Sequence, residues 1–509
     1  MNARDERSRS CWMDVTIDDD GPLTGDATAD VVIVGTGIAG LSTAYELAGL
    51  GQQVLLIDRG AIGGGMTART TAHLASALDD YYSELAAIHG EDAARRYYES
   101  QARAIDRIEA ICRADAADAN FARVDGYLFA ARPEDVADIE AEHDMCRTLG
   151  IAAEWADRAP IAGRDTGRAL RFPGQGRVHP MRYLAGLARA VRRAGGRIHR
   201  DTAYVADRET AEGVEIETAA GHVLQAKAAV FATNSPVNDR IAIHTKQLPM
   251  RTYAIAGPVP ARSAPDALLW DSLEAYHYVR LQPLDAETDL LIVGGEDHRS
   301  GTATDMDARF AALSDWTRER FPAFGEPTFR WSGQVLEPMD FMPFSGRNPG
   351  DRRIFVHSGD SGQGITNGVA GALTIAPLVA DAPARYADLF DPSRKPFTAR
   401  PSLANFIEGQ VGAVKNFAEY ATPGEIASEN ELEPGCGAIL RDGARKLAVY
   451  RRPDGAVSRR SAVCTHAGCI VHWNPLELCW DCPCHGSQFS AEGEVLNGPA
   501  LTPLAAADQ

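Results

Sequence analysis

The chain has 509 residues, 45% of them hydrophobic, and a formal net charge of −19 at pH 7. A chain of this length can form three compact units, and its acidic balance argues against nucleic-acid binding because no basic surface would offset phosphate repulsion. No apolar run is long enough to span a membrane, and residues 1–10 lack the apolar core of a signal peptide, so we expect a cytoplasmic protein.

Residues 31–58 have the signature of a dinucleotide-binding unit. The apolar run 31–34 predicts a buried strand, 41–50 predict an amphipathic helix, and 54–57 predict a second strand that ends at Asp58. The intervening glycines permit a tight turn and the approach of a pyrophosphate to the helix N-terminus, while Asp58 would accept hydrogen bonds from ribose hydroxyls. A glycine turn without a ligand is the alternative. The predicted binding residues are Gly35, Gly37, Ile38, Ala39, Gly40, Asp58 and Arg59.

Three further segments favour FAD over NAD. A glycine-rich stretch at 62–73 follows Asp58 closely, where flavoproteins run the chain past the pyrophosphate and ribityl groups. Residues 228–234 predict a strand that returns to the same sheet, and 354–368 predict a strand, a glycine turn and a helix start. That helix N-terminus would stabilise negative charge on the reduced flavin. The further predicted contacts are Gly65, Thr70, Thr71, Val205, Thr233, Gly359, Gly362, Gly364, Ile365 and Thr366.

Residues 28–382 are predicted to form a discontinuous α/β FAD-binding domain, Rossmann-like and of the GR2 type, with an α+β substrate domain. Alternating apolar stretches at 276–281 and 290–293 predict antiparallel strands of the substrate domain. The expected boundaries are 1–27 for an N-terminal extension, about 28–115, 170–240 and 335–382 for the FAD-binding domain, about 120–170 and 241–334 for the substrate domain, 383–414 for a proline-rich linker and 415–509 for a C-terminal domain.

Candidate catalytic residues lie in the predicted substrate domain and in the glycine-rich stretch. Flavin oxidation of an amine needs the substrate C–H bond held over the ring and a group that orients any carboxylate. Arg280 would clamp such a carboxylate, with a surface salt bridge as the stronger alternative. His73 would lie near the flavin, either as a covalent attachment point or as an ordinary hydrogen-bonding histidine. The candidates are Arg69, Tyr253, His277, Tyr278 and Arg280.

Two Cys/His boxes near the C-terminus predict a metal centre. Cys464 and His466 form a C-x-H box, and Cys482 and His485 form a C-x-x-H box, so two loops offer two thiolates and two imidazoles. In a Rieske [2Fe-2S] centre these ligands divide between two irons, which gives a reduction potential of roughly −150 to +300 mV. A structural zinc site is the alternative. The second cysteine in each box, the Gly-Ser after the last ligand and the Gly-Pro-Ala at 498–500 favour the Rieske centre.

Both parts of the chain resemble known families. Residues 30 to about 380 resemble the FAD-dependent D-amino-acid oxidase superfamily, near its glycine/sarcosine oxidase and gamma-glutamylputrescine oxidase branch. The supporting segments are 178–180, 291–298, 331–333 and 340–343. Residues 415–509 resemble a Rieske domain, which implies an all-β fold and a disulfide between Cys469 and Cys484.

The Rieske resemblance has one departure. High-potential members carry Tyr two residues after the Ser of the second box, whereas this chain has Phe489, although Ser487 keeps the other hydroxyl donor. Because hydrogen bonds to the sulfurs stabilise the reduced cluster, we expect a potential below that of the respiratory members. It should still lie above that of ferredoxins without histidine ligands.

Together the two resemblances imply a dehydrogenase. A small-molecule substrate, expected to be an amine or amino acid, gives two electrons to FAD, and the cluster passes them singly to a ferredoxin, cytochrome or quinone. An NAD(P)H-dependent reductase is the alternative enzyme, but no second G-x-G-x-x-G is evident. A non-catalytic redox sensor is the alternative of a different class. The sequence leaves a homo-oligomer open, and it lacks the pattern for the mononuclear iron of a Rieske oxygenase.

Overall fold

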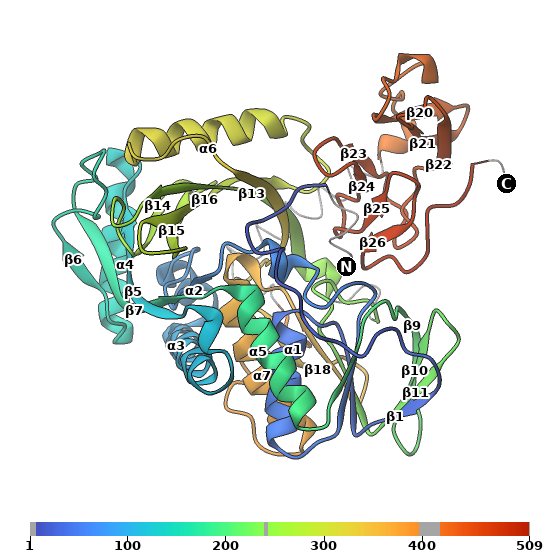
Figure 1. Ribbon diagram of the computed structural model, residues 1–509, viewed down its shortest axis with the longest axis horizontal. Coiled ribbons are helices and arrows are strands. Elements are labelled where there is room, and N and C mark those ends of the chain that lie inside the picture. The colour runs from blue at the N-terminus through green and yellow to red at the C-terminus, as the bar shows by residue number, and fades with distance from the viewer. Residues whose placement is uncertain (1–6, 239–242, 396–417, 508–509) are drawn as a thin grey trace.

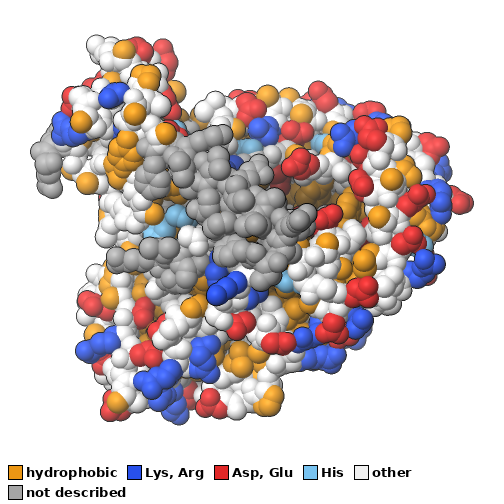
Figure 2. Space-filling view, turned by 180° about the vertical axis from the view of Figure 1, so that it is seen from behind, with side chains coloured by type: hydrophobic (Ala, Val, Ile, Leu, Met, Phe, Trp, Pro, Cys, Tyr) orange, Lys and Arg blue, Asp and Glu red, His pale blue; other side chains and the backbone are white. Residues whose placement is uncertain are grey.

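The computed structural model describes residues 7–238, 243–395 and 418–507. Two large sheets and their helices form the body of the molecule, and short C-terminal strands form a lobe beside it (Figure 1). From behind, the lobe projects from the body, and basic side chains are interspersed with acidic ones on the described surface (Figure 2). None of the described helices combines the length and the apolar character needed to span a bilayer.

The first large sheet has six strands in the order β18-β19-β12-β2-β3-β8, and only the pair β18 and β19 is antiparallel. Its central strands are buried on both faces, as expected for parallel strands covered by helices. The strands are β2 (Val31–Val34), β3 (Val54–Ile57), β8 (Arg197–His199), β12 (Ala228–Phe231), β18 (Phe344–Arg347) and β19 (Ile354–Ser358).

Helices and a small sheet flank the six-stranded sheet. Helix α1 packs against α5 and α7, and α3 packs against α7. The long helices of this part are α1 (Ile38–Gly49), α3 (Glu91–Asp115), α5 (Pro180–Arg193) and α7 (Gly364–Val379). A four-stranded sheet consists of β1 (Ala27–Thr28), β11 (Val223–Ala226), β10 (Val214–Thr218) and β9 (Tyr204–Glu209), in that order.

The second large sheet is mostly antiparallel and has nine strands, which include the strands predicted for the substrate domain. Its order is β17-β13-β16-β15-β14-β5-β7-β4, and β6 pairs with β7. The strands are β4 (His73–Leu74), β5 (Ala122–Phe129), β6 (Glu154–Ala156), β7 (Ala169–Arg177), β13 (Gln247–Pro260), β14 (Leu268–Asp271), β15 (Tyr278–Pro283), β16 (Thr288–Arg299) and β17 (Phe329–Pro338). The remaining α-helices are α2 (Tyr82–His89), α4 (Val136–Leu149) and α6 (Met306–Arg320).

The C-terminal lobe is built from two small antiparallel sheets. The first contains β20 (Gly437–Asp442), β21 (Arg445–Arg451) and β22 (Val457–Ser461). The second contains β23 (His472–Asn474), β24 (Cys479–Asp481), β25 (Gln488–Ser490) and β26 (Val495–Asn497). Short 3-10 helices occur at Met66–Arg69, Ala117–Ala119, Pro133–Asp135, His244–Lys246, Ser361–Gln363, Glu419–Ala421 and Glu429–Glu431. The all-β expectation for this part of the chain is confirmed.

The predicted strands at 31–34, 54–57 and 228–231 have these bounds in the structure. The helix expected at 41–50 begins earlier, at Ile38, directly after the glycine turn. Gly35 in that turn has φ +105°, and an added Cβ would lie 2.3 Å from the carbonyl oxygen of Ala232, so only glycine fits there.

Residues 383–395, the described part of the predicted linker, pack against the body. Phe390 is fully buried, and Arg394 forms an ion pair with the buried carboxylate of Asp340 at 2.8 Å. The rest of the predicted linker, 396–414, and the first residues of the predicted C-terminal domain, 415–417, lie outside the described residues. The domain boundaries given above therefore stay predictions.

Candidate active site and cluster site

A cavity of about 220 Å³ is lined by residues of both large sheets. At one end it meets the glycine turn before α1 and the acid Asp58 at the end of β3. At the other end it is lined by Tyr276, Tyr278 and acidic residues from three separate segments. Residues 497 and 498 of the C-terminal lobe also border it. One continuous space therefore joins the predicted nucleotide site, the predicted substrate domain and the lobe.

The nucleotide end has the features that a dinucleotide requires. One carboxylate oxygen of Asp58 accepts hydrogen bonds from the backbone and hydroxyl of Thr36 at 2.8 and 2.6 Å, and the other accepts from the Gly60 amide at 3.1 Å. The N-terminus of α1 borders the cavity without a side-chain cap, which leaves amide groups for a pyrophosphate. These residues fit FAD, and the proposal is that the α1 N-terminus and Asp58 hold its phosphates and ribose.

Most of the predicted FAD contacts come together in this cavity. The lining includes Gly35, Gly37, Ile38, Ala39, Asp58, Arg59, Gly65, Thr70, Thr71, Thr233, Gly362, Gly364 and Ile365. The structure places the remaining four predicted contacts, Gly40, Val205, Gly359 and Thr366, outside the lining. Gly40 packs α1 onto the turn instead, because an added Cβ would lie 2.0 Å from the Gly35 carbonyl oxygen.

The other end of the cavity is acidic and aromatic. The Tyr276 hydroxyl donates to Asp79 at 2.9 Å, and Tyr278 and Thr252 share a hydrogen bond of 2.7 Å. Asp297 and Glu337 line the same space. None of Asp79, Asp297 and Glu337 forms an ion pair with a cation among the described residues.

The carboxyl groups of this acidic end have raised pKa values. Burial raises the pKa of Asp79 to about 6, partly opposed by the hydrogen bond from Tyr276. Burial also raises the pKa of Asp297 to about 7, with Thr252 opposing and Asp79 adding to the shift. The pKa of Glu337 lies well above its usual range because of burial and of repulsion by Asp80, Asp297 and Asp79. The common cause is burial: a space poorly accessible to water disfavours the charged form of each carboxyl group.

Three of the predicted catalytic residues lie outside the cavity lining. The Tyr253 hydroxyl is hydrogen-bonded to His298 at 2.8 Å. His277 pairs with Asp271 at 2.9 Å and stacks on Trp316. The structure therefore places neither Tyr253 nor His277 at the cavity, and Arg280 is the third residue outside it.

Arg280 is also fully buried, and it does not act as a carboxylate clamp in this structure. Its guanidinium donates to the backbone oxygens of Ala72 at 2.6 Å and Val178 at 3.0 Å, and to the side chain of Gln282 at 2.6 Å. Burial lowers its pKa to about 9, with Arg177 adding to the shift. Arg280 joins three chain segments, which neither a surface salt bridge nor a substrate clamp would do.

The other candidates lie at the cavity. His73 and Tyr278 line its substrate end, and burial together with the charge of Arg280 lowers the pKa of His73 to about 3, so this imidazole is neutral. Arg69 lines the cavity, but its guanidinium points into an interface with the lobe, where it pairs with Glu477 at 3.3 Å. The ion pair with Glu477 thus occupies the group that was predicted to act on the substrate.

The four predicted cluster ligands lie on two neighbouring loops of the lobe. The rings of His466 and His485 have centroids 4.9 Å apart, and Cys464 and Cys482 are both buried. A hydrogen bond from the Cys482 thiol is the main reason that the pKa of Cys464 falls to about 7, and the Ser487 hydroxyl also contacts this sulfur.

The donor set of these loops fits a [2Fe-2S] cluster. The Nδ1 atom of His485 is buried and has no hydrogen-bond partner among the described residues, as expected of an atom reserved for a metal. A disulfide joins Cys469 and Cys484, so these two cysteines cannot act as thiolate ligands although Cys482 lies close to both. The proposed ligands therefore remain two sulfurs and two imidazole nitrogens.

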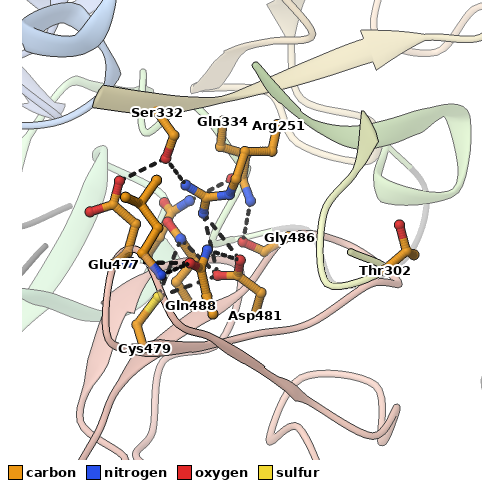
Figure 3. Close-up of polar contacts among 12 residues, drawn as sticks. Arg251, Thr302, Ser332, Gln334, Glu477, Cys479, Asp481, Gly486 and Gln488 are labelled. Atoms are coloured by element: carbon orange, nitrogen blue, oxygen red, sulfur yellow. Dashed lines mark hydrogen bonds and ion pairs between the residues drawn. The ribbon is translucent and has the colours of Figure 1, made fainter. Parts of the chain in front are cut away.

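A buried polar interface fixes the lobe on the body (Figure 3). Arg251 of β13 pairs with Asp481 of β24 at 3.2 Å, and both side chains are almost completely buried. Arg69 pairs with Glu477, which also accepts from the hydroxyl of Ser332 at 2.7 Å and from the backbone of Ser8 at 2.9 Å. The N-terminal segment, β17 and the lobe thus meet at one carboxylate.

A sequence profile of the family described as FAD dependent oxidoreductase matches residues 30–378, and one of the Rieske [2Fe-2S] domain matches residues 423–508. The chain therefore belongs to the FAD dependent oxidoreductase family and carries a C-terminal Rieske domain. The family implies FAD, and the domain implies a [2Fe-2S] cluster.

Individual relatives match nearly the whole chain or about seven tenths of it. The putative Rieske 2Fe-2S iron-sulfur protein YhfW of Bacillus subtilis (strain 168) is 30% identical over 95% of this chain and 94% of its own length. The gamma-glutamylputrescine oxidoreductase of Escherichia coli (strain K12) is 25% identical over 71% of this chain and 86% of its own. The crystal structure of glycine oxidase from Geobacillus kaustophilus covers 72% of this chain and 99% of its own, with a TM-score of 0.61 at 19% identity, and so shares the fold.

Sequence reasoning missed the acidic end of the cavity and the polar interface. Asp297 follows the apolar run 290–293 in β16, and Glu337 follows Val335 and Leu336 in β17, and an acidic residue next to such apolar positions is a signal that could have been noted. Gln334, Arg251 and Asp481 have no such local signal, because the partners that they meet across the interface are separated from them by 150 positions or more along the chain.

Proposed function

We propose that the protein oxidises a small cationic amine at the acidic end of the cavity and passes the electrons through the Rieske domain to one-electron acceptors. The observation that supports this most is the continuity of one cavity from the α1 turn to a cluster of carboxyl groups that have no cationic partner among the described residues. When bound, FAD takes up two electrons from a substrate, and a Rieske cluster carries one at a time.

The chemistry of the acidic end favours a cation over an amino-acid carboxylate. A substrate carboxylate would face Asp79, Asp297 and Glu337 in a low-dielectric space, which is unfavourable unless an arginine compensates. Of the two arginines in the lining, Arg59 borders the nucleotide end and Arg69 is paired with Glu477. An ammonium group would instead restore the ionised carboxylates, and the rings of Tyr276 and Tyr278 would flank its alkyl chain.

The side chains can also remove the proton that blocks oxidation. An amine must lose one ammonium proton before its carbon can give up a hydride, and Oδ1 of Asp297 is buried without a hydrogen-bond partner among the described residues. With a pKa of about 7, this carboxyl can accept the proton. A neutral primary amine then loses a hydride, which is two electrons and one proton, and becomes an iminium ion, which water hydrolyses to a carbonyl compound and ammonium. Two acceptor molecules each gain one electron, and the proton of the hydride is released to solvent.

The test is anaerobic mixing of the full-length holoprotein with a panel of amines, matched amino acids and NAD(P)H, followed by flavin bleaching. We expect bleaching by amines without a carboxylate, and weaker or no bleaching by the matched amino acids. Asp297→Asn should raise the amine concentration for half-maximal bleaching by about tenfold to a hundredfold, the loss of one charged hydrogen bond.

The matched control is Glu287→Gln, which removes an exposed acid from the turn between β15 and β16. It should leave bleaching unchanged. Bleaching by amino acids alone would reverse the choice of substrate class, and bleaching by NAD(P)H alone would replace the proposal by a reductase.

A further inference from the structure

The loop that carries His485 is held from the body of the molecule on both sides. Gln334 of β17 donates from Nε2 to the carbonyl oxygen of Gly486 at 2.9 Å, directly after the ligand (Figure 3). Arg299 of β16 donates to the carbonyl oxygen of Pro483 at 3.2 Å, two residues before it. The second cluster loop is therefore bound by the same sheet that forms the substrate end of the cavity.

Gln334 also reaches the cavity. It is part of the cavity lining although only 1% of its surface is exposed, and its amide oxygen accepts from Asn497, which lines the cavity as well. The fit to the loop is close, since a Cβ added at Gly486 would lie 2.8 Å from Nε2 of Gln334. One side chain thus joins the cavity wall to the residue next to a cluster ligand.

The face of the cluster site that carries the imidazoles is turned toward the body. The ring of His244, which belongs to the body, lies 5.0 Å from the ring of His466 and 5.8 Å from that of His485, between centroids. Two fully buried ion pairs, Arg251 with Asp481 and Arg69 with Glu477, lie in the same interface. Moving the lobe away would expose or separate these charges, which is costly.

We propose that the lobe is fixed in this position and that electrons pass from the cavity to the cluster within one chain, across the contact between Gln334 and the Gly486 peptide. Gln334 is a positioning residue that keeps the His485 loop against the cavity wall. The proposal rests on the proposed relay. One electron crosses at a time, so the two electrons of each substrate molecule require two crossings and reduce two acceptor molecules.

The experiment follows cluster reduction after the bound flavin is reduced by a light pulse with a deazaflavin donor, without any substrate. We expect a first-order rate that does not change with protein concentration. Gln334→Leu should abolish this fast phase while the FAD content, the EPR spectrum of the chemically reduced cluster and the extent of flavin photoreduction stay as in the wild type. Hydrogen–deuterium exchange at residues 482–486 should increase in the same variant.

The matched control is Ser332→Ala, which removes hydrogen bonds from the same strand and interface but touches no residue of the cluster loops. It should retain the fast phase. A rate that grows with protein concentration, or an unchanged fast phase in Gln334→Leu, would overturn the proposal, as would an equal loss in Ser332→Ala. Because the flavin is reduced by light, this experiment can be interpreted even if the protein does not oxidise amines. Flavin bleaching by amines, in turn, does not depend on the rate of cluster reduction.

Discussion

Two groups of carboxylates, both removed from bulk water, have opposite surroundings in this protein. In the interface, Glu477 and Asp481 each face an arginine, and although burial pushes the pKa of Glu477 upward, Arg69 and Arg251 lower it below its usual value. In the cavity, Asp297 and Glu337 face no ion-pair partner among the described residues, and their pKa values rise. The interface carboxylates already have arginine partners, whereas the cavity carboxyl groups would gain a charge partner only when a cation binds.

The largest effect is expected from breaking an interface pair. Arg251→Met leaves the buried carboxylate of Asp481 without its charge partner, which should cost about 3–5 kcal/mol of unfolding free energy. Chemical denaturation followed by cluster and flavin absorbance would measure it. Arg318→Met, which removes exposed pairs with Asp315 and Glu326, should cost less than about 1 kcal/mol. Equal losses in the two variants would remove the distinction between the interface and an ordinary surface pair.

The cavity should respond in the opposite way. Glu337→Gln removes a carboxyl that is raised in pKa by burial and by neighbouring acids, so the free protein should keep its stability or gain about 1 kcal/mol. Amine binding, measured by perturbation of the flavin spectrum, should weaken by about tenfold or more. A large loss of stability would mean that Glu337 has a structural partner like those of the interface.

The two groups should also differ in pH dependence. Asp297 gains its charge only as the pH rises through about 7, so amine affinity should fall by about tenfold per pH unit below that value. Glu477 has a folded-state pKa below the unfolded value of 4.5, so its contribution to stability is complete above pH 4.5 and is lost as the pH falls through the folded pKa. Titration calorimetry from about pH 5 to 8 would show the amine curve, and thermal melting from about pH 2 to 8 would show the stability curve. If amine affinity and stability fell over the same pH range, the proposed difference between the cavity and the interface would be wrong.

The smallest effect concerns the cluster, where a hydroxyl is aimed at a charged sulfur. Ser487→Ala removes the hydroxyl that contacts Cys464, so the reduction potential should fall by about 60 mV, the equivalent of about 1.4 kcal/mol for one electron. A spectroscopic redox titration measures it, with Ser490→Ala at the end of the neighbouring strand β25 as control. The lower potential expected from Phe489, relative to respiratory members, stays a prediction that the wild-type titration tests.

The elements around the nucleotide turn and the family of both parts could be predicted from the sequence, because their signals are local. The strands at 31–34 and 54–57 and the spacing of Cys464 and His466 are each contained in a few neighbouring residues. The candidate substrate residues were harder, since polar residues in strands look alike before their strands are placed. Arg280 turned out to join backbone segments, and Tyr253 is covered by His298.

The interface could not be predicted from local patterns at all. Residues 1–27 were expected only as an extension, yet Ser8 takes part in the contact between body and lobe. Its partners become neighbours only after both sheets and the lobe have formed. A charge pattern along the chain contains no information on such pairs, because the arginine and the acid of each pair belong to separate domains.

The contact between Ser8 and Glu477 has a consequence for how the chain assembles during synthesis. These residues are separated by 469 positions, so Ser8 leaves the ribosome long before Glu477 has been synthesised. The oxidoreductase part can fold first, as N-terminal domains generally do, whereas the bond from Ser8 to Glu477 must wait for the Rieske domain. The contact between Ser8 and Glu477 is then a late step, and a chain terminated before residue 477 would keep the contacts of Ser8 with Arg69 but lack the carboxylate that joins this segment to the lobe.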